Sequence, residues 1–370
     1  MKRLIALLLV ALLLVGCGKQ EPVAETQPTT EPVTTEAPTT EPTTEPTTEP
    51  TEPPTEAPTE PPVRHPLTGE IIDAPFTGQV TSVSVNNIIG CLPQHGISQA
   101  DICYEIETES GITRILALFT ELENIEKLGP VRSSRTFFNA ISYMYQAPFV
   151  HCGAGIPARY GYMDNYVTQI EDWQHVDANV SPKYFYRDQD RLNRGVAYEH
   201  TLFTTGPNVL QALQDKEYAK VNENGLDFGL VFTEEPAITG DTANTVTVSF
   251  KGSKTTTFTY DAATGLYTAH QYDMTHIDGN TEEPITYRNV IALYTSHTKA
   301  VVSNTTRSFY ELLGSGTGHM AVDGKIVPIL WYHDSYEAPF TYTLEDGTPL
   351  ELGVGRTYFA ITGGNPTTFE

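Results

Sequence analysis

A repetitive segment near the start of the chain limits which residues can fold. From Glu21 to Pro62 the sequence repeats Thr-Thr-Glu-Pro and close variants, with ten Glu residues, no aromatic residue and no Lys or Arg. Such a segment cannot bury enough apolar surface to offset its ordering entropy, so we expect residues 17–63 to form a disordered spacer. Its Pro residues and repelling charges favour a reach between about 35 Å for a flexible coil and about 130 Å for polyproline II. The folded region is therefore expected to begin near residue 64.

The residues before the spacer predict export and lipid attachment. Lys2 and Arg3 precede an apolar run that ends in Leu14-Val15-Gly16-Cys17. The run is roughly 13 residues long, shorter than the ~20 residues that span a bilayer, and its small Gly16 lets a signal peptidase approach the next bond. We therefore predict a lipoprotein signal peptide over residues 1–16. Cys17 would carry acyl chains such as palmitate, which anchor the protein on the extracytoplasmic face of the bacterial cell membrane.

The charge of residues 64–370 excludes one class of partner. These roughly 307 residues suffice for two domains of ordinary size. They contain 36 acidic and 19 basic residues, a net formal charge of −17. A surface this acidic offers no basic footprint for a phosphate backbone, so we expect no nucleic-acid partner.

The first half of the folded region mixes helical and strand patterns. Apolar residues from Phe137 to Tyr145 follow three-and-four spacing after Ser133-Ser134, which we expect to cap the helix, and Pro207 suits the first turn of a second helix. Strand-like runs occur at residues 115–119 and 149–151. These patterns predict a mixed α/β domain over residues 64–238.

The second half reads as mostly β. Apolar and polar residues alternate in seven segments, at residues 245–250, 255–260, 266–271, 290–294, 318–322, 326–333 and 356–361. Asp323-Gly324 is a two-residue hairpin signal between two of them. We expect a mostly-β domain over residues 239–370, and an α+β fold for the chain as a whole.

Three cysteines follow Cys17, an odd number that leaves at least one thiol unpaired. Cys91 and Cys103 are close enough in sequence to form a disulfide, a question that the sequence leaves open. Cys152 follows His151, and a thiol beside an imidazole suggests a nucleophile. A free cysteine in the buried strand around residue 150 is the better interpretation.

Several segments of the folded region resemble one bacterial family. They are His65-Pro66-Leu67-Thr68-Gly69, Gly96 to Ile102, Gly111-Ile112-Thr113-Arg114, Gly129 to Arg135, Arg187-Asp188, Gly314 to Gly318 and Trp331. Over about residues 65–362 the chain resembles the YerB-like lipoproteins, a two-domain family of unknown function. The resemblance implies a fold and an envelope location, and it implies no reaction.

The sequence also departs from that family. Where many relatives have Pro-His-Asn near the end of the first domain, this chain reads Tyr198-Glu199-His200-Thr201. Relatives commonly carry Ala where this chain has Cys152. A family mechanism would therefore not use that thiol.

Charged residues set among apolar ones are the candidate site. Glu105, Glu107 and Glu109 would share one face of an extended segment. Their natural partners are Arg114, Arg132 and Arg135, because the guanidinium fork binds a carboxylate through two hydrogen bonds. We prefer an internal ion-pair network. Two alternatives are a ligand site built from Arg132, Arg135 and His151, and a Glu105/Glu109 pair for acid–base chemistry on a glycan.

The two later arginines flank the expected helix cap. A cation near a helix N-terminus is disfavoured by the helix dipole unless an anion is present. We expect an internal carboxylate such as Glu105 or Glu109 to hold at least one of Arg132 and Arg135. Otherwise, a ligand carboxylate or phosphate would supply the anion.

Two other segments resemble catalytic or phosphate-binding motifs only in part. The loop Gly314 to Gly318 lacks the Gly-Lys-Ser/Thr ending of a phosphate-binding loop, so we expect a tight turn there. Ser296-His297-Thr298-Lys299 has the Ser-x-x-Lys spacing of penicillin-binding enzymes in a strand-like setting that does not suit them. No zinc-helix or calcium-loop motif occurs, and we predict no cofactor and no metal site. Tyrosines at 143, 145, 160 and 162 could contact a glycan or lie at the core edge.

Two functions from different classes fit these residues. The preferred one is a non-enzymatic binding or scaffold lipoprotein at the cell envelope, which recognises a wall glycan or another envelope protein. The alternative is an envelope hydrolase or transferase that acts on wall glycan or peptide through the Glu/Arg/His residues. No catalytic residue is assigned, because an enzyme needs two titratable groups that face one cleft.

Replacing Cys17 tests the predicted anchor. Cys17→Ala should abolish acylation and move the chain out of the membrane fraction, because no other apolar segment would hold it there. Fractionation and immunoblotting measure the shift. Membrane retention of a Cys17→Ala chain that has lost its signal peptide would contradict the prediction.

Overall fold

The fold is taken from a computed structural model. The structure describes residues 61–109, 111–153, 174–218, 222, 225–250, 254–302, 304–364 and 367–370. Residues 60–370 form one compact unit. The predicted signal peptide, Cys17 and nearly all of the spacer lie outside the described residues, as do Tyr160 and Tyr162.

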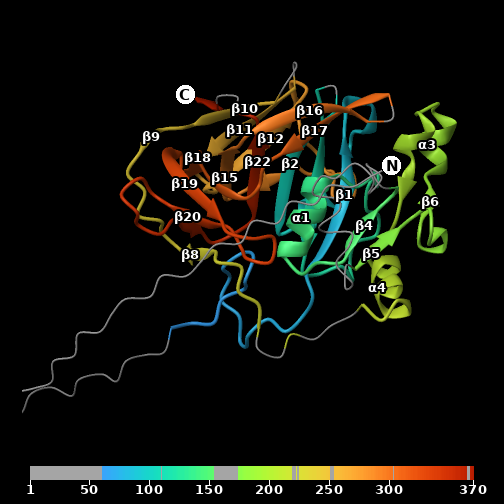
Figure 1. The fold of residues 1–370 in the computed structure, drawn as a ribbon, viewed down its shortest axis with the longest axis horizontal. Coiled ribbons are helices and arrows are strands. Elements are labelled where there is room, and N and C mark those ends of the chain that lie inside the picture. Colours follow the sequence, from blue (N-terminus) through green and yellow to red (C-terminus); the bar gives the residue numbers. More distant parts are fainter. Residues whose placement is uncertain are drawn as a thin grey trace, which may run out of the picture. The chain divides into compact units, whose positions relative to one another are not determined.

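The described residues form a central sheet of eleven strands, drawn in Figure 1. Its order is β20-β19-β18-β15-β22-β2-β3-β1-β4-β5, and β9 pairs with β19. The strands are β1 (Thr81–Asn87), β2 (Ile102–Glu109), β3 (Ile112–Phe119), β4 (Phe149–His151), β5 (His175–Asp177), β9 (Asp241–Thr242), β15 (Asn289–Tyr294), β18 (Gly314–Val322), β19 (Lys325–His333), β20 (Thr341–Thr343) and β22 (Thr357–Thr362).

Strands from both halves of the sequence meet in the middle of this sheet. β2 pairs in parallel with β22, from Ile102 opposite Thr357 to Ile106 opposite Ile361. β22 also pairs in parallel with β15. The sheet therefore crosses the expected boundary between residues 238 and 239, and the division into two domains at that point stays a prediction.

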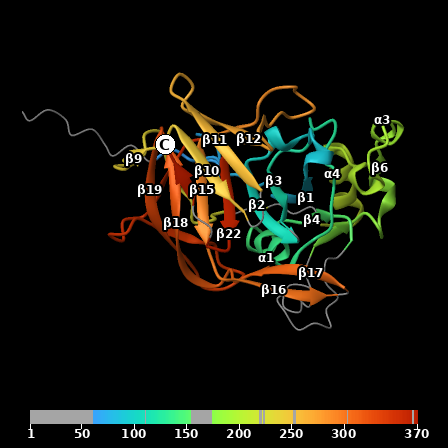
Figure 2. The ribbon, with the colours of Figure 1, turned by 90° about the horizontal axis from the view of Figure 1, so that it is seen from above.

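A second, six-stranded sheet of the described residues covers one face of the central sheet (Figure 2). Its strands are β10 (Thr245–Ser249), β11 (Thr255–Asp261), β12 (Leu266–Gln271), β13 (Met274–Thr275), β14 (Thr286–Tyr287) and β23 (Thr367–Phe369). Phe258 and Tyr267 of this sheet pack in one buried cluster with Val85, Ala117 and Tyr358 of the central sheet. The alternating apolar residues of β10 to β12 face this cluster, as period-two patterning requires.

Helix α1 (Thr136–Met144) covers the opposite face. Its Phe137, Phe138 and Ile141 pack in a second cluster with Leu116 and Phe359. The hairpin of β16 (His297–Val302) and β17 (Thr305–Tyr310) lies on the same side, and the ring of its Tyr310 is 5.5 Å from that of Phe137.

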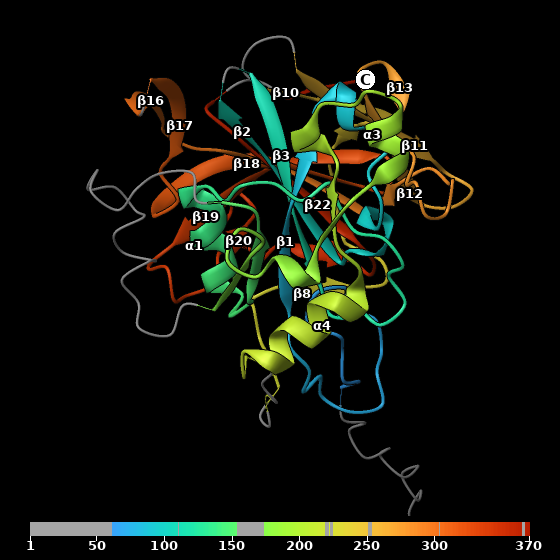
Figure 3. The same ribbon diagram turned by 90° about the vertical axis from the view of Figure 1, so that its right-hand side faces the viewer.

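Smaller elements gather at the β4–β5 end of the sheet (Figure 3). There lie α3 (Gln189–Asn193), α4 (Gly206–Asp215), the ribbon of β6 (Tyr186–Arg187) with β7 (Leu202–Phe203), and the 3-10 turns η4 (Pro182–Tyr184) and η5 (Tyr198–His200). The remaining described elements are η1 (Ile89–Cys91), η2 (Ile97–Gln99), β8 (Val231–Thr233) and β21 (Glu351–Gly353). None of the helices in the described ranges is long and apolar enough to cross a membrane.

The sequence patterns identify most of these elements. The structure has few helices and many strands, so the expected α+β class is confirmed. Both expected helices are present, and Pro207 lies in the first turn of α4. Asp323 and Gly324 have φ angles of 53° and 69° and join β18 to β19 in the expected two-residue hairpin.

Two local predictions are wrong. The residue before the first turn of α1 is Arg135, with no side-chain cap, and the Ser134 N–H donates to the Gly153 carbonyl at 3.0 Å. Residues Gly314 to Gly318 belong to β18 and form no tight turn. Gly316 is needed there because a Cβ atom would lie 2.6 Å from the Trp331 ring and from the Tyr294 carbonyl oxygen.

The cysteines of the folded region are free thiols. Cys91 and Cys103 are fully buried, and Cys152 is partly exposed. Burial raises the pKa of Cys91 to about 12 and that of Cys103 to about 11, as expected for thiols that pack as apolar side chains.

Candidate functional site: an arginine cluster around Glu109

A β-bulge near the end of β2 separates the three glutamates. Glu107 lies opposite Thr113 of β3, whereas Glu109 lies opposite Ile112. Consecutive residues of a strand point to opposite faces, so a shift of one residue turns a side chain to the other face. The expectation that all three glutamates share one face is therefore wrong across the bulge.

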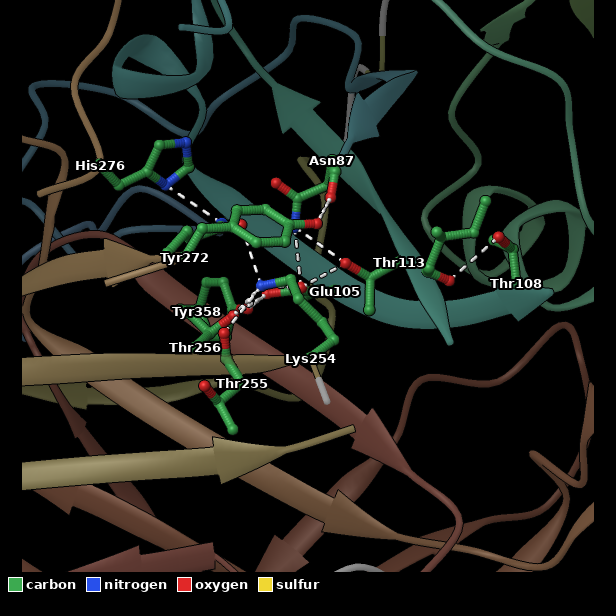
Figure 4. A network of polar contacts seen from close by, with 12 residues as sticks. Asn87, Glu105, Thr108, Thr113, Lys254, Thr255, Thr256, Tyr272, His276 and Tyr358 are labelled. Carbon is green, nitrogen blue, oxygen red and sulfur yellow. Dashed lines mark hydrogen bonds and ion pairs between the residues drawn. The ribbon is translucent and has the colours of Figure 1, made fainter. Parts of the chain in front are cut away.

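Glu105 lies fully buried between the two sheets, as Figure 4 shows. Its Oε1 accepts hydrogen bonds from Asn87 at 2.8 Å and Thr113 at 2.5 Å, and lies 3.1 Å from Lys254 Nζ. Its Oε2 accepts from the hydroxyls of Thr256, at 2.7 Å, and Tyr358. Burial alone raises the pKa of this carboxyl, but the charge of Lys254 and the hydrogen bonds outweigh it, so the pKa lies below its ordinary value.

The polar network continues beyond Glu105. Lys254 Nζ donates to Gln271 at 3.0 Å, and Gln94 joins Asn87 at 2.8 Å to His276 at 2.6 Å. These residues come from both halves of the sequence. The network therefore fastens the second sheet to the central one, and Glu105 is enclosed within it.

Glu107 makes a separate ion pair. Its Oε1 lies 2.8 Å from Lys299 Nζ of β16 and accepts a hydrogen bond from the Gly111 N–H at 3.2 Å. Lys299, which belongs to the Ser-x-x-Lys match, thus attaches the β16–β17 hairpin to β2.

Glu109 is surrounded by arginines, and we call this group the arginine cluster: Glu109, Arg114, Arg132, Arg135 and Arg307. Arg135 donates from Nε at 3.0 Å and from Nη2 at 2.6 Å to Glu109 Oε2. Arg114 Nη2 and Arg307 Nη1 lie 3.2 Å and 2.9 Å from Oε1. Burial alone raises the pKa of Glu109, but the charges of Arg114, Arg135 and Arg307 outweigh it and lower the pKa to about 2.

Arg132 extends the cluster toward β4. Its Nη1 donates to the Glu199 carbonyl at 2.9 Å, and its own carbonyl accepts from the Cys152 N–H at 3.0 Å. Its charge contributes to lowering the pKa of Arg114, after burial and Arg135. Of the two arginines that flank the expected cap, Arg135 is the one that Glu109 holds, and Arg132 binds only a backbone carbonyl among the described contacts.

The cluster carries more positive than negative charge. Three guanidinium groups contact the Glu109 carboxylate, and Arg132 adds a fourth positive charge near Arg114 and Arg135. Arg114 and Arg135 are only 2% and 3% exposed. Among the described side chains, the Nε–H groups of Arg114, Arg132 and Arg307 are buried without a hydrogen-bond partner. Each orphaned buried donor costs about 1–3 kcal/mol, and more for a charged group, so the cluster is short of acceptors and of negative charge.

His151 lies on the other side of Arg132, in β4. Its Nε2 is 3.0 Å from His175 Nδ1, and its Nδ1 is 3.2 Å from the Gly153 carbonyl oxygen. Burial lowers the pKa of His151 to about 4, so the imidazole is neutral at pH 7. The structure thus brings Arg114 and Arg135 to Glu109, leaves Arg132 on the Glu199 carbonyl, and places His151 against β5.

Two further charged residues were missed by the sequence reasoning. Arg307 approaches Glu109 across 198 positions of sequence, and Lys254 approaches Glu105 across 149. Neither belongs to a motif. Only the pairing of the two halves in space brings them to β2, so no local pattern could have found them.

Comparison with known proteins finds two family domains that match this chain. Residues 67–219 match the N-terminal domain described as "Protein of unknown function (DUF3048)", and residues 246–359 match the DUF3048 C-terminal domain. Together these regions span well over half of the chain. The chain belongs to the DUF3048 family. Strands from both family domains form the central sheet.

Two DUF3048 relatives are informative. The chain is 25% identical to the "Putative lipoprotein YerB" of Bacillus subtilis (strain 168) over 309 residues, which cover 80% of this chain and 88% of the relative. Its fold is similar to the crystal structure of the YerB protein from Bacillus subtilis, with a TM-score of 0.69 at 23% identity. That match covers 83% of this chain and 99% of the other. The resemblance to YerB-like lipoproteins is confirmed.

Removing the cation beside Glu105 should strongly lower the stability of the fold. Lys254→Met leaves a buried carboxylate without its counter-charge, which costs about 3–5 kcal/mol in the free energy of unfolding. Urea unfolding measures the change. The control is Lys183→Met, which breaks a surface ion pair with Asp215 and should leave the free energy of unfolding nearly unchanged. If Lys254→Met and Lys183→Met change the free energy of unfolding equally, the buried pair of Lys254 and Glu105 contributes no more stability than a surface pair, and the prediction is wrong.

In the arginine cluster, loss of the carboxylate should destabilise the fold much more than loss of the outermost arginine, Arg307. Glu109→Gln removes the one carboxylate among the buried guanidiniums and should lower the free energy of unfolding by about 3–5 kcal/mol. Arg307→Gln should change it by less than about 1 kcal/mol, because Glu109 keeps Arg114 and Arg135.

The pH dependence of stability provides a second readout. A lowered carboxyl pKa stabilises the fold above the unfolded value of 4.5, and this contribution is lost as the pH falls toward about 2. Glu109→Gln should flatten the acid limb of the unfolding curve. A variant that keeps both wild-type stability and the wild-type acid limb would disprove this account of Glu109.

Proposed function

We propose that this DUF3048 protein is a lipid-anchored binding module on the extracytoplasmic face of the bacterial membrane, and that the arginine cluster binds its ligand. The ligand is an anionic group, a carboxylate or a phosphate, of a wall polymer or of another envelope protein. The contact of three guanidinium groups with the single Glu109 carboxylate, and the further charge of Arg132 beside them, support this assignment.

The chemistry of the cluster favours an anion. Guanidinium groups bind carboxylates and phosphates through charge-assisted hydrogen bonds and keep their charge when partly buried. A bound anion would accept hydrogen bonds from Nε–H donors that lack partners among the described residues. It would also reduce the repulsion among Arg114, Arg132 and Arg307.

The net charge of the chain restricts how such a ligand binds. The sequence carries a formal charge of −24, so a polyanion is repelled at long range. The arginine cluster reverses this sign locally. Binding should therefore depend on close contacts in the cluster rather than on steering by the whole surface.

The geometry does not favour the hydrolase or transferase alternative. Glu105 is enclosed in the polar network with five partners, and Glu109 is held by arginines on the other side of the bulge. These two carboxylates do not face one cleft, as an acid–base pair requires. The geometry therefore gives no support to the Glu105/Glu109 hypothesis for acid–base chemistry, which stays a prediction that this proposal does not adopt.

Binding to purified wall sacculi tests the proposed function. We expect the full chain in detergent to sediment with sacculi, and Arg307→Gln to weaken this binding about tenfold through loss of one charge-assisted contact. Arg194→Gln, which removes the same charge at an exposed residue of the α3 region, should bind as the wild type does. An equal effect of the two variants would contradict the assignment of the site. Release of soluble wall fragments by the chain would favour the enzyme instead.

A further inference from the structure

A pocket of about 280 Å³ lies beside the arginine cluster, at the end of β4. Cys152, Asn179, Phe185, Arg187, Tyr198 and Leu202 contribute to its walls. Two backbone hydrogen bonds of 3.0 Å, from Cys152 to Arg132 and from Ser134 to Gly153, hold this end of β4 against residues 132–134. Arg132 is therefore a neighbour of Cys152 in the pocket wall, and its charge acts on both Cys152 and Arg114.

The lining combines ring-shaped apolar surface with a few polar groups. Tyr198 is 62% exposed, and the guanidinium of Arg187 lies 3.8 Å from the centre of its ring. Arg187 Nη1 also donates to the Tyr198 carbonyl at 2.6 Å, which fixes this wall. The polar groups are the Cys152 thiol, the Asn179 amide and Arg187. Small-molecule sites have this composition and a volume of roughly 300–1,000 Å³. The pocket, at about 280 Å³, lies just below that range and has room for about one ring.

The charges around the pocket cancel. Asp177, Arg187 and Arg132 act electrostatically on the Cys152 thiol, and Glu199 lies close to Arg132 and Arg187. Arg132 and Arg187 are thus balanced near the pocket by Asp177 and Glu199. Without Arg132, the cluster still has Arg114, Arg135 and Arg307 around one carboxylate. The pocket suits an uncharged group, and the anion belongs on the cluster side of Arg132.

We infer that the pocket at Cys152 holds the neutral ring of the ligand whose anionic group binds the arginine cluster, and that the ligand is an acidic saccharide, carboxylated or phosphorylated. This inference rests on the proposed function. A sugar ring has an apolar face that stacks on an aromatic ring such as Tyr198, and its hydroxyl edge suits the Asn179 amide and the Arg187 guanidinium. Tyr198 lies in the segment where this chain departs from many relatives, so it would help to determine which saccharide binds.

Cys152 provides a built-in reporter for this pocket. Among the described cysteines, Cys91 and Cys103 are fully buried, so a maleimide should label Cys152 first in the full, lipidated chain. Labelling rates, read by mass spectrometry of the Cys152 peptide, are compared with glucuronate, glucose 1-phosphate, glucose and inorganic phosphate at one concentration. We expect an acidic sugar to slow labelling about threefold or more, and glucose or phosphate alone to have little effect. Protection by glucuronate alone or by glucose 1-phosphate alone identifies the anionic group.

A matched pair of tyrosine variants tests the role of Tyr198 in the lining of the pocket. Tyr198→Ala should weaken protection by the acidic sugar about threefold to tenfold, the loss of one aromatic contact. Tyr332→Ala, at a tyrosine of β19 that is 49% exposed, should leave protection unchanged. Circular dichroism verifies that both variants fold.

The outcomes separate the pocket from the cluster. Equal labelling rates with all four compounds, while sacculus binding still depends on Arg307, would overturn the pocket assignment alone. Loss of the difference between Tyr198→Ala and Tyr332→Ala would do the same. If Arg307→Gln also binds sacculi as the wild type does, the proposed function and the saccharide inference fail together.

Discussion

The pairing of β2 with β22 joins the two halves of the folded region into a single body, and Glu105 lies at the centre of that contact. Glu105 is paired with Ala360 of β22 through the backbone, while its carboxylate accepts hydrogen bonds from β1, β3, β11 and β22. A buried carboxylate is costly unless each of its oxygens is bonded and its charge is balanced, and here Lys254 supplies the balance. The carboxylate is satisfied only when strands from both family domains are in place, so it favours one arrangement of the two sheets.

The same strand presents two carboxylates in contrasting surroundings. Glu105 has one cation and several neutral donors, and the described side chains that bond it leave no buried polar atom without a partner. Glu109, four residues later, has too many cations and leaves Nε–H groups unbonded. The bulge between Glu107 and Glu109 causes this difference. It shifts the register of β2 by one residue, so that Glu109 points to the other face of the strand, toward Arg114. The carboxylate that packs the interior and the carboxylate at the proposed ligand site thus lie on one strand of eight residues.

How far the sequence predicts this structure depends on the range of the interactions. Three-and-four spacing identifies α1, alternation identifies β10 to β12, and Asp323-Gly324 identifies the hairpin, because each pattern is local. The position of β22 beside β2, the bulge, and the approach of Arg307 to Glu109 depend on contacts between distant residues. The cap of α1 was misjudged because Ser134 bonds Gly153, a tertiary contact that replaces the local one. The arginines near residue 130 were identified as a candidate site, but their charge excess could be counted only in space.

The central place of β22 has a consequence for the order in which the sheet can form. Synthesis of the chain delivers β1, β2 and β3 first, yet the neighbour of β2 on its other side is formed by residues 357–362. Until those residues emerge, β2 is an edge strand whose buried side chains and backbone groups are open to wrong partners. The sheet built on β1, β2 and β3 therefore stays incomplete until the residues of β22 are available, and Glu105 lacks its Tyr358 partner until then.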